Sequence, residues 1–587
     1  MGTLKLLFIT NLLLLLRPIP LHSANTYNVG DPVTLFVNKI GPLHNPSETY
    51  QYYELAFCRP DQVVKKKENL GEVLNGDRLA NSLYKLDFAV NKTQAVICQQ
   101  KLNRVDIAKF KDAIINDFYY QMYYDDLPLW AFIGKVEDES LTGDNKGPKY
   151  FLFTHVQFNA LYNGNQVLEI SAFCDPSHVV EIAEGVDMEI KFTYSVLWNG
   201  VSTPYENRMD RYSRASLQPI IHKTHWFSFI NSTVILILLM GLLTVLFMRH
   251  LKNDLRKWSI GGDEEEEKEV GWKYIHGDIF RCPSNLPLFS AVLGCGTQLV
   301  TMVAILFILA FIGVIYPYSR GTLPSSIFIA YILTSAVAGY SSSSFCSQYA
   351  EIGWRRSALL AGLLFFSPFL FTGFILNILA SSFGATRALP LGTIFVIFLV
   401  YTFVSIPLLI LGGVFGHRYN SDLQSSPVTK KCPREIPSLS FYRKTPAQMF
   451  LGGLLPFCAI APELHNLCAT IWGHKIYTSP GILLVTFIIL IILTAMLSVG
   501  LTYFQLAVED HDWWWRSVLR GGSTALFMFC YCIYFYFKSN MSGILQTSFF
   551  LGYSTCMCYA FFLMLGTVSF QASLLFVRRI YHAAKSE

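Results

Sequence analysis

The first residue whose type and position suggest chemistry is Glu463, a carboxylate well inside an apolar stretch that runs from 447 to 471. A charged side chain is costly in hydrocarbon, so it is expected to face the interior of a helical bundle and to find a partner there. By residue type, the nearest candidate partners are His465, Asn466 and Asn377. Two interpretations stay open for Glu463: a buried hydrogen-bonding strut, or a contact with an ion or another protein.

A run of serines is the second candidate. Ser341 to Ser344 lie inside the apolar stretch 325–347, which favours a wall that faces the bundle or a cavity over one that faces lipid. Gly339-Tyr340-Ser341 is loosely similar to the nucleophile region of an intramembrane serine protease, with His465 as the base. A helix face of small residues accounts for the same residues without a nucleophile, and we favour this structural interpretation.

Two further clusters each have a chemical and a structural interpretation. Asp125-Asp126 would serve as paired carboxylates, but the leucine and proline that follow favour a strand end and a turn. A metal-binding trio is conceivable ahead of the second long apolar stretch, where turn chemistry is the better explanation; it consists of His276, Asp278 and Cys282. The strings HExxH and GxSxG and the Walker loop are absent from the sequence. We therefore expect no enzymatic activity, no metal site and no cofactor.

The composition places these candidates in a membrane protein. Hydrophobic residues make up 52% of the chain and charged residues 15%, against about 25% charged residues in soluble domains. Residues 25–225 have ordinary globular composition, and the apolar surplus follows them. The net charge of +5 bears on topology, because basic residues gather in cytoplasmic loops, and we infer no nucleic-acid binding from it.

Residues 1–24 have the features of a cleaved signal peptide. Lys5 precedes an apolar core from Leu6 to Leu16, and the small residues Ser23 and Ala24 mark its exit. The core is too short to span a bilayer. The mature chain is therefore expected to begin near Asn25 in the lumen of the secretory pathway.

Nine later stretches are long and apolar enough to cross a membrane, which takes about 20 residues. We predict a polytopic α-helical membrane protein with nine transmembrane helices, an N-terminal lumenal mainly-β domain (25–225) and a cytosolic tail (578–587). The predicted spans are 226–248, 288–316, 325–347, 357–380, 391–416, 447–471, 480–507, 518–537 and 546–576.

The distribution of basic residues sets the orientation of these spans. The short loops assigned to the lumen hold only Arg320, Arg387, Lys475 and Lys538. The cytoplasmic loops and tail hold about five times as many, as the positive-inside rule requires. With an odd number of spans, the amino terminus is lumenal and the carboxyl terminus is cytosolic.

The lumenal domain alternates in hydrophobicity over many segments. Tyr84, Leu86, Phe88 and Val90 share one face, which predicts a half-buried strand, and 33–40, 150–158, 166–173 and 188–198 are similar. The exception is 105–119, where apolar residues recur at helical spacing and predict a helix: Ile107, Phe110, Ile114 and Phe118.

Two kinds of covalent modification are expected in this domain. Asn91-Lys92-Thr93 directly follows a predicted strand, and we expect a glycan on Asn91; the sequons at Asn231 and Asn540 lie in or against spans and should stay unused. Among the thirteen cysteines, only three meet the oxidising lumen, which allows one disulfide and one leftover thiol: Cys58, Cys98 and Cys174.

Several strings, in order along nearly the whole mature chain, resemble those of the nonaspanins, the transmembrane 9 superfamily. The lumenal ones are GPLHNPSETY at 41–50, FC at 57–58 and YQMYYDDLPLW at 120–130. Those at and between the spans are HWFS at 225–228, GWK at 271–273, HGDIFR at 276–281, GGLLPF at 452–457, WWWRS at 513–517 and QTSF at 546–549. KSE at 585–587 ends the set.

This resemblance implies a non-enzymatic protein of Golgi and endosomal membranes. The family is associated with the sorting and surface delivery of other membrane proteins, with adhesion and with phagocytosis, so the expected partners are membrane-protein clients, bound through transmembrane helices in the lipid bilayer. It also implies a Golgi-retention motif, Lys585-Ser586-Glu587, read by the COPI coat. Phe576, Val577 and Tyr581 are either an export signal for the COPII coat or interfacial anchors of the last helix.

The resemblance also covers the segment around Cys58, and we predict a disulfide between Cys58 and Cys98 that leaves Cys174 free or weakly reactive. One departure stands next to Glu463, where the family has an apolar pair and this chain has Ala461-Pro462. A proline there frees a backbone carbonyl and bends the helix. The environment of Glu463 is therefore expected to differ from that of the corresponding glutamate in other members of the family.

Small residues leave one more alternative open. Gly412 and Gly416 form a GxxxG pair, and Gly294, Gly296, Gly339, Gly452 and Gly453 recur in other spans. They serve either close packing within the bundle or a groove for a client's transmembrane helix. A rival function is a transporter, in which Glu463 and the wall from Ser341 to Ser344 line a pathway for an ion or small solute.

Overall fold

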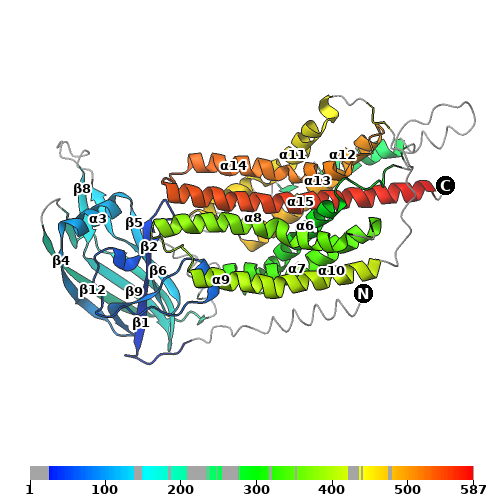
Figure 1. Cartoon of the computed structure of the whole chain (residues 1–587). Helices are drawn as coiled ribbons and strands as arrows, with labels where there is room; N and C mark the ends of the chain where they lie inside the picture. Colours follow the sequence, from blue (N-terminus) through cyan, green and yellow to red (C-terminus); the bar gives the residue numbers. More distant parts are fainter. Residues whose placement is uncertain are drawn as a thin grey trace, which may run out of the picture. The chain divides into compact units, whose positions relative to one another are not determined.

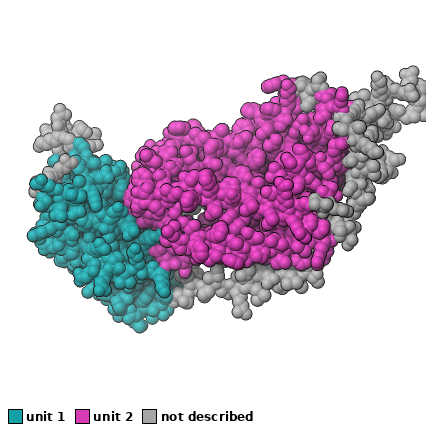
Figure 2. Space-filling model, viewed as in Figure 1, with its two compact units in different colours: residues 1–43, 51–67, 78–217 teal, residues 44–50, 68–77, 218–587 magenta. Residues whose placement is uncertain are grey.

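The computed structural model describes residues 25–137, 148–182, 187–205, 208, 275, 278–315, 320–350, 353–420, 435–437, 441–473 and 479–585, and most positions of 233–253. The chain divides into two compact units, coloured separately in Figure 2. One is built from residues 1–43, 51–67 and 78–217. The other contains 218–587 and two short pieces of the N-terminal region, 44–50 and 68–77.

The first unit is mainly β-structure, as predicted. One sheet has the strand order β2-β1-β5-β6 with β3 on β1, a second has the order β10-β9-β12-β4, and a third has the order β11-β8-β7. The strands are β1 Pro32–Pro42, β2 Tyr50–Gln51, β3 Ala80–Asp87, β4 Lys92–Leu102, β5 Phe118–Tyr124, β6 Leu127–Phe132, β7 Gly134–Glu137, β8 Lys149–Phe153, β9 His155–Asn163, β10 Gln166–Cys174, β11 Val179–Glu181 and β12 Met188–Gly200.

The string at 120–130 forms the hairpin of β5 and β6. Asp125 and Asp126 make its two-residue turn, both with positive φ (47° and 61°), the backbone conformation that a tight hairpin turn requires. Met122, Tyr124 and Leu127 are buried on either side of it. The turn interpretation of this aspartate pair is therefore the one that the structure adopts.

The predicted helix at 105–119 is shorter than expected. Helix α3 covers Arg104–Ile115, begins with a capping box between Asn103 and Asp106, and buries Ile107, Phe110 and Ile114. Asp117 has φ 49°, which ends the helix, and Phe118 opens strand β5. The placement of Phe118 on a helix was wrong because its apolar spacing also fits the strand that follows.

The structure joins Cys58 to Cys98, with their Cα atoms 5.9 Å apart. Such a bond typically stabilises a domain by about 2 to 4 kcal/mol. The ring of the adjacent Phe57 stacks on Tyr52 at 4.8 Å. Cys174 is free, its thiol donates to the Phe132 carbonyl at 3.2 Å, and burial raises its pKa to about 11, so its thiolate is scarce.

The second unit is a helical bundle (Figure 1), and its described residues include eight helical stretches long and apolar enough to cross a membrane. The helices are α6 Leu286–Phe311, α7 Thr322–Tyr349, α8 Trp354–Ser382, α9 Leu391–Val400, α10 Ile406–Asn420, α11 Thr445–Ile471, α12 Pro480–Leu506, α13 Trp514–Gly522, α14 Thr524–Lys538 and α15 Ile544–Lys585. A π turn, Tyr401–Ser405, joins α9 to α10 in one stretch, and α13 with α14 makes another.

The first predicted span, 226–248, falls largely outside the described residues. The positions of 233–253 that are described are helical. Among them, Phe247 contacts the rings of Tyr503 on α12 at 5.4 Å and Phe576 on α15 at 5.9 Å. This helix therefore packs on the bundle. The acidic run at 263–267 lies outside the described residues.

The glycines that the sequence singled out lie between helices of the bundle. A Cβ on Gly294 of α6 would lie 2.7 Å from the Ala338 carbonyl of α7, and one on Gly412 or Gly416 of α10 would overlap backbone carbonyls of α7. Gly296 likewise meets α15. These positions serve close packing within the chain, and the alternative of an open groove at them was wrong.

A side chain of another helix replaces the backbone hydrogen bond that one helix-internal proline removes. Pro368 of α8 has no N–H, so it cannot donate to the carbonyl of Leu364. The Tyr559 hydroxyl of α15 donates to that carbonyl instead, at 3.1 Å. A backbone acceptor that hydrocarbon would leave unpaired is thus satisfied within the bundle.

A pair of histidines in the first unit makes its stability sensitive to pH. His155 is buried, with Nδ1 2.8 Å from Thr193 Oγ1 and Nε2 3.0 Å from Ser195 Oγ. Its ring lies 5.1 Å from that of His178, which pairs with Asp175 at 2.7 Å. Burial, and then His178, lower the pKa of His155 below its usual 6.5, while Asp175 opposes the shift.

Because the unfolded chain then binds a proton on His155 more readily than the folded one, stability should fall as the pH drops below about 6.5. We expect the protection factors of amides in β9 and β12, taken against the intrinsic exchange rate at each pH, to fall between about pH 7.5 and about pH 5.5, and His155→Gln to flatten that dependence. His178→Asn, which leaves the burial of His155 intact, should retain most of it. A dependence equally steep in His155→Gln would assign the effect to other groups.

Candidate functional site

Glu463 lies on α11 and is half-buried. Asn466 hydrogen-bonds its carboxyl group, whereas the buried Oε2 has no partner among the described residues. Of the three partners that the sequence suggested, only Asn466 is used. Asn377 on α8 instead accepts from the Leu389 N–H at 2.6 Å.

His465 points away from Glu463, because residues two apart on a helix are rotated by about 200°. Its side chain is exposed, Nδ1 lies 2.9 Å from the Tyr531 hydroxyl of α14, and its ring is 5.6 Å from Phe535. The expectation that His465 would pair with Glu463 was therefore wrong. The two side chains leave the helix on different faces.

The serine wall belongs to another part of the bundle. Ser342 and Ser343 are fully buried, and Ser341 lies 3.3 Å from Thr297 of α6. Helix α7 packs on α6, α8 and α10, whereas α11 packs on α12, α13 and α14. The structure thus brings neither Ser341 to His465 nor the wall to Glu463, which argues against the protease and against one pathway lined by both.

The other chemical candidates have structural partners. Asp278 pairs with Arg281 at 2.7 Å in a turn, and no metal-binding cluster occurs within the described residues; His276 is outside them. Asn91 is exposed next to the start of β4, and its side-chain oxygen accepts from the Trp198 N–H at 2.7 Å.

The candidate export signal is buried in part. Val577 and Tyr581 belong to the bundle core, and Phe576 packs against it, which favours a packing role for these residues over a signal that a coat could read. Helix α15 continues to Lys585, beyond the range expected for the last span. Ser586 and Glu587 lie outside the described residues.

Sequence reasoning missed a buried polar seam made of seven side chains on three helices: Ser498, Thr502 and Gln505 of α12, Ser517 and Arg520 of α13, and Ser569 and Ser573 of α15. Ser498 Oγ lies 2.7 Å from Ser573 Oγ, which lies 3.0 Å from Thr502 Oγ1. The spacing 498, 502, 505 and 569, 573 puts each set on one helix face, a signal that could have found the seam.

Arg520 is the charged member of the polar seam. Its helix starts at Trp514, four residues before the predicted span, and its side chain is only 1% exposed. Its guanidinium donates to Gln505 Oε1, to Thr502 Oγ1 at 3.4 Å and to the Arg516 carbonyl at 3.2 Å. The polar seam therefore supplies a buried cation with neutral acceptors and ties α12 to α13.

Two segments of the N-terminal region bond to loops and helix starts of the bundle and form what we call the clamp, residues 44–50 and 68–77. In the first segment, the Ser47 N–H donates to the buried Gln546 Oε1 at 2.9 Å, and Thr49 Oγ1 lies 2.7 Å from Thr386 Oγ1. Asn45 accepts from the Ser542 N–H at 3.1 Å. The string at 41–50 thus reaches the loops before α9 and α15.

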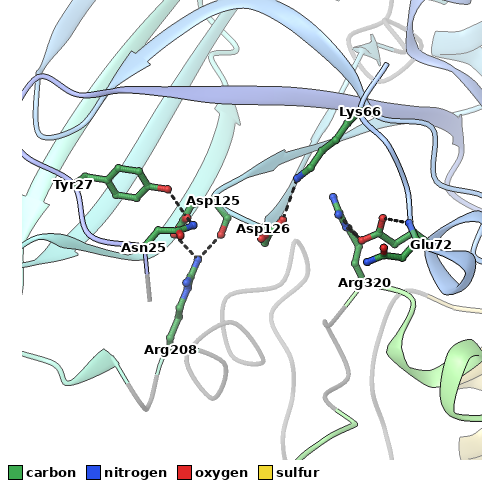
Figure 3. A network of polar contacts seen from close by, with 9 residues as sticks. Asn25, Tyr27, Lys66, Glu72, Asp125, Asp126, Arg208 and Arg320 are labelled. Carbon is green, nitrogen blue, oxygen red and sulfur yellow. Dashed lines mark hydrogen bonds and ion pairs between the residues drawn. The ribbon is translucent and has the colours of Figure 1, made fainter. Parts of the chain in front are cut away.

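The second clamp segment centres on helix α2, Leu70–Leu74 (Figure 3). Glu72 caps this helix through the Asn69 N–H at 3.0 Å and pairs with Arg320, whose Nε lies 3.1 Å from Glu72 Oε1. Both side chains are nearly buried. A Cβ on Gly71 or on Gly321 (φ 66°) would overlap the other's backbone, so both glycines are needed for this approach.

Figure 3 also shows a separate network in the first unit. Asp125 in the hairpin turn accepts from Asn25 at 2.9 Å and from the Tyr27 hydroxyl at 2.7 Å, and it pairs with Arg208 at 3.1 Å. Its neighbour Asp126 pairs with Lys66 at 3.6 Å. The aspartates are thus engaged in structural bonds that fasten both ends of the described domain to one turn.

Comparison with known proteins identifies relatives along the full chain. The family model for endomembrane protein 70 matches residues 49–544. Transmembrane 9 superfamily member 5 of Arabidopsis thaliana is 55% identical over 566 residues, 96% of this chain and 96% of that protein. Member 1 of Bos taurus is 39% identical over 567 residues, covering 94% and 93%. No solved structure matches the chain.

The clamp yields a prediction about local stability. Glu72→Gln removes the carboxylate that pairs with the nearly buried Arg320 guanidinium, and breaking such a pair typically costs about 3 to 5 kcal/mol. We expect much faster amide exchange at 68–77 in the detergent-solubilised full-length protein. Asp126→Asn, at the more exposed pair with Lys66, is the control and should change exchange at its own site by about 1 kcal/mol or less. Unchanged exchange at 68–77 would show that the ion pair does not hold α2.

Proposed function

We propose a function on one premise: this chain belongs to the transmembrane 9 superfamily, the endomembrane protein 70 family. It acts without catalysis, as a sorting or escort factor in Golgi and endosomal membranes. Its N-terminal domain lies in the lumen, its bundle contacts client membrane proteins, and its cytosolic tail engages the COPI coat. The family resemblance and the distribution of basic residues support this placement.

The observation that carries the proposal is the unpartnered Oε2 of Glu463 inside a membrane helix. Polar groups in spans normally pair within the bundle and, where they do not, mark a functional site. The described residues leave this oxygen without a hydrogen-bond partner, which a bound ligand would supply. A binding role therefore suits this helix better than a purely structural one.

A transporter is the second candidate, since an intramembrane acid also suits ion coupling. Glu463→Gln discriminates between the two. As a sorting factor, the protein in vesicles should show no solute flux with either side chain, and the variant should change which membrane proteins reach the cell surface. Flux that is present with glutamate and lost with glutamine, while surface delivery stays normal, would replace the sorting proposal with the transporter.

The tail yields a separate prediction. Lysine followed two residues later by an acidic terminus matches the family's retention signal, so replacing Lys585 and Glu587 together with alanine should abolish COPI binding. The tagged protein should then move from the Golgi to later compartments, as followed by microscopy, whereas Ser586→Ala should stay. A double variant that remains in the Golgi and still binds purified coat would contradict the retention role.

A further inference from the structure

One face of α11 is covered by no other described helix. Its exposed residues follow at intervals of four, three, four and three and form a narrow stripe along the helix: Leu451, Leu455, Cys458, Pro462 and His465. Apolar positions that repeat every 3.5 residues are the seam along which one helix packs on another. We call this set the α11 stripe.

The α11 stripe contains a backbone acceptor that the helix itself cannot satisfy in the usual way. Pro462 has no N–H, so the carbonyl of Cys458 loses its regular donor. Elsewhere in the bundle the same deficit, at Leu364, is met by the Tyr559 hydroxyl. No side-chain donor reaches the Cys458 carbonyl from the described part of the chain.

His465 adds a second polar group to the same face, seven residues further on. Its Nδ1 is engaged with Tyr531, while its Nε2 has no partner within the described ranges, and the side chain is exposed. At 1.5 Å per residue, the two polar positions are about 10 Å apart along the helix. Lipid tails offer hydrogen bonds to neither group.

We propose that the α11 stripe binds one transmembrane helix of another membrane protein, which presents two hydrogen-bonding side chains, such as serine or threonine, seven residues apart. One hydroxyl group of the occupant donates to the Cys458 carbonyl, a second hydrogen-bonds His465 Nε2, and the apolar positions of the occupant cover Leu451 and Leu455. This inference rests on the proposed sorting function and assigns the site and the chemistry of its client.

Complementarity favours such a client over a second copy of this chain. A two-fold contact would set each stripe against itself. It would then place the Cys458 carbonyl, for which Pro462 supplies no N–H donor, opposite another acceptor. Plain lipid would leave both polar groups unsatisfied.

Binding can be measured with the full-length protein in lipid nanodiscs and synthetic leucine-rich transmembrane peptides. One peptide carries two serines seven residues apart, a second carries them five apart and therefore on different faces, and a third has none. We expect the first to bind most tightly, with about a threefold loss of affinity for each hydrogen bond removed. Energy transfer from a labelled peptide reports the affinity.

Two variants of the chain test the same bonds independently. Pro462→Ala restores the N–H that the Cys458 carbonyl lacks, and His465→Leu removes the imidazole; each should lower the affinity for the seven-spaced peptide by about threefold. Pro368→Ala is the matched control, because its freed carbonyl is already satisfied by Tyr559. That variant should bind the peptide as the unaltered chain does.

Three results would overturn the inference: equal binding of all three peptides, binding unaffected by both variants, or no peptide binding together with dimers oxidatively cross-linked through Cys458. The proposed function is read separately, as the surface abundance of membrane proteins. If sorting depends on the chain while the peptides are not discriminated, the site assignment fails and the sorting function stands. If the peptides are discriminated but loss of the chain changes no protein's delivery, the sorting function fails instead.

Discussion

Hydrocarbon forms no hydrogen bonds, and this constraint governs the helical unit. Most polar groups within its described spans are paired by the chain itself. Hydroxyls on α12, α13 and α15 bond one another in the polar seam, which also accommodates the Arg520 guanidinium. Tyr559 satisfies the carbonyl that Pro368 frees. A few buried polar atoms of the described bundle have no partner, among them those of Gln298, Ser357 and Thr524, and Glu463 Oε2 on α11 is the one that belongs to a carboxyl group.

The clamp extends the same principle to the ends of the helices. Loops there expose backbone donors and acceptors, and the string at 41–50 supplies partners for the loops before α9 and α15. Glu72 combines two tasks, since one oxygen caps α2 while the other pairs with Arg320. Residues 44–50, which look like an ordinary loop in the sequence, are thus an integral part of the helical unit.

The hydrophobic pattern of the sequence predicted those elements that depend on the burial of a single segment. Long apolar runs indicated the membrane helices, and alternation indicated the strands, because both reflect burial of one element against its surroundings. Contacts between distant segments had no such signal. Nothing near Glu463 shows that His465 turns toward Tyr531, and nothing near Arg520 shows that its guanidinium bonds Thr502 and Gln505. The helix at 104–115 was extended too far because the strand after it continues the apolar spacing.

Taken together, these features describe a bundle that pairs most of its polar groups internally, and the account assigns client contact to α11. The most direct measurement is site-specific photo-cross-linking in intact cells. A photoreactive residue is placed at Leu455 on the α11 stripe or at Phe371, which is 67% exposed on α8. The account predicts adducts with a defined set of membrane proteins from position 455 and lipid adducts from position 371. The same lipid adducts from both positions would contradict it.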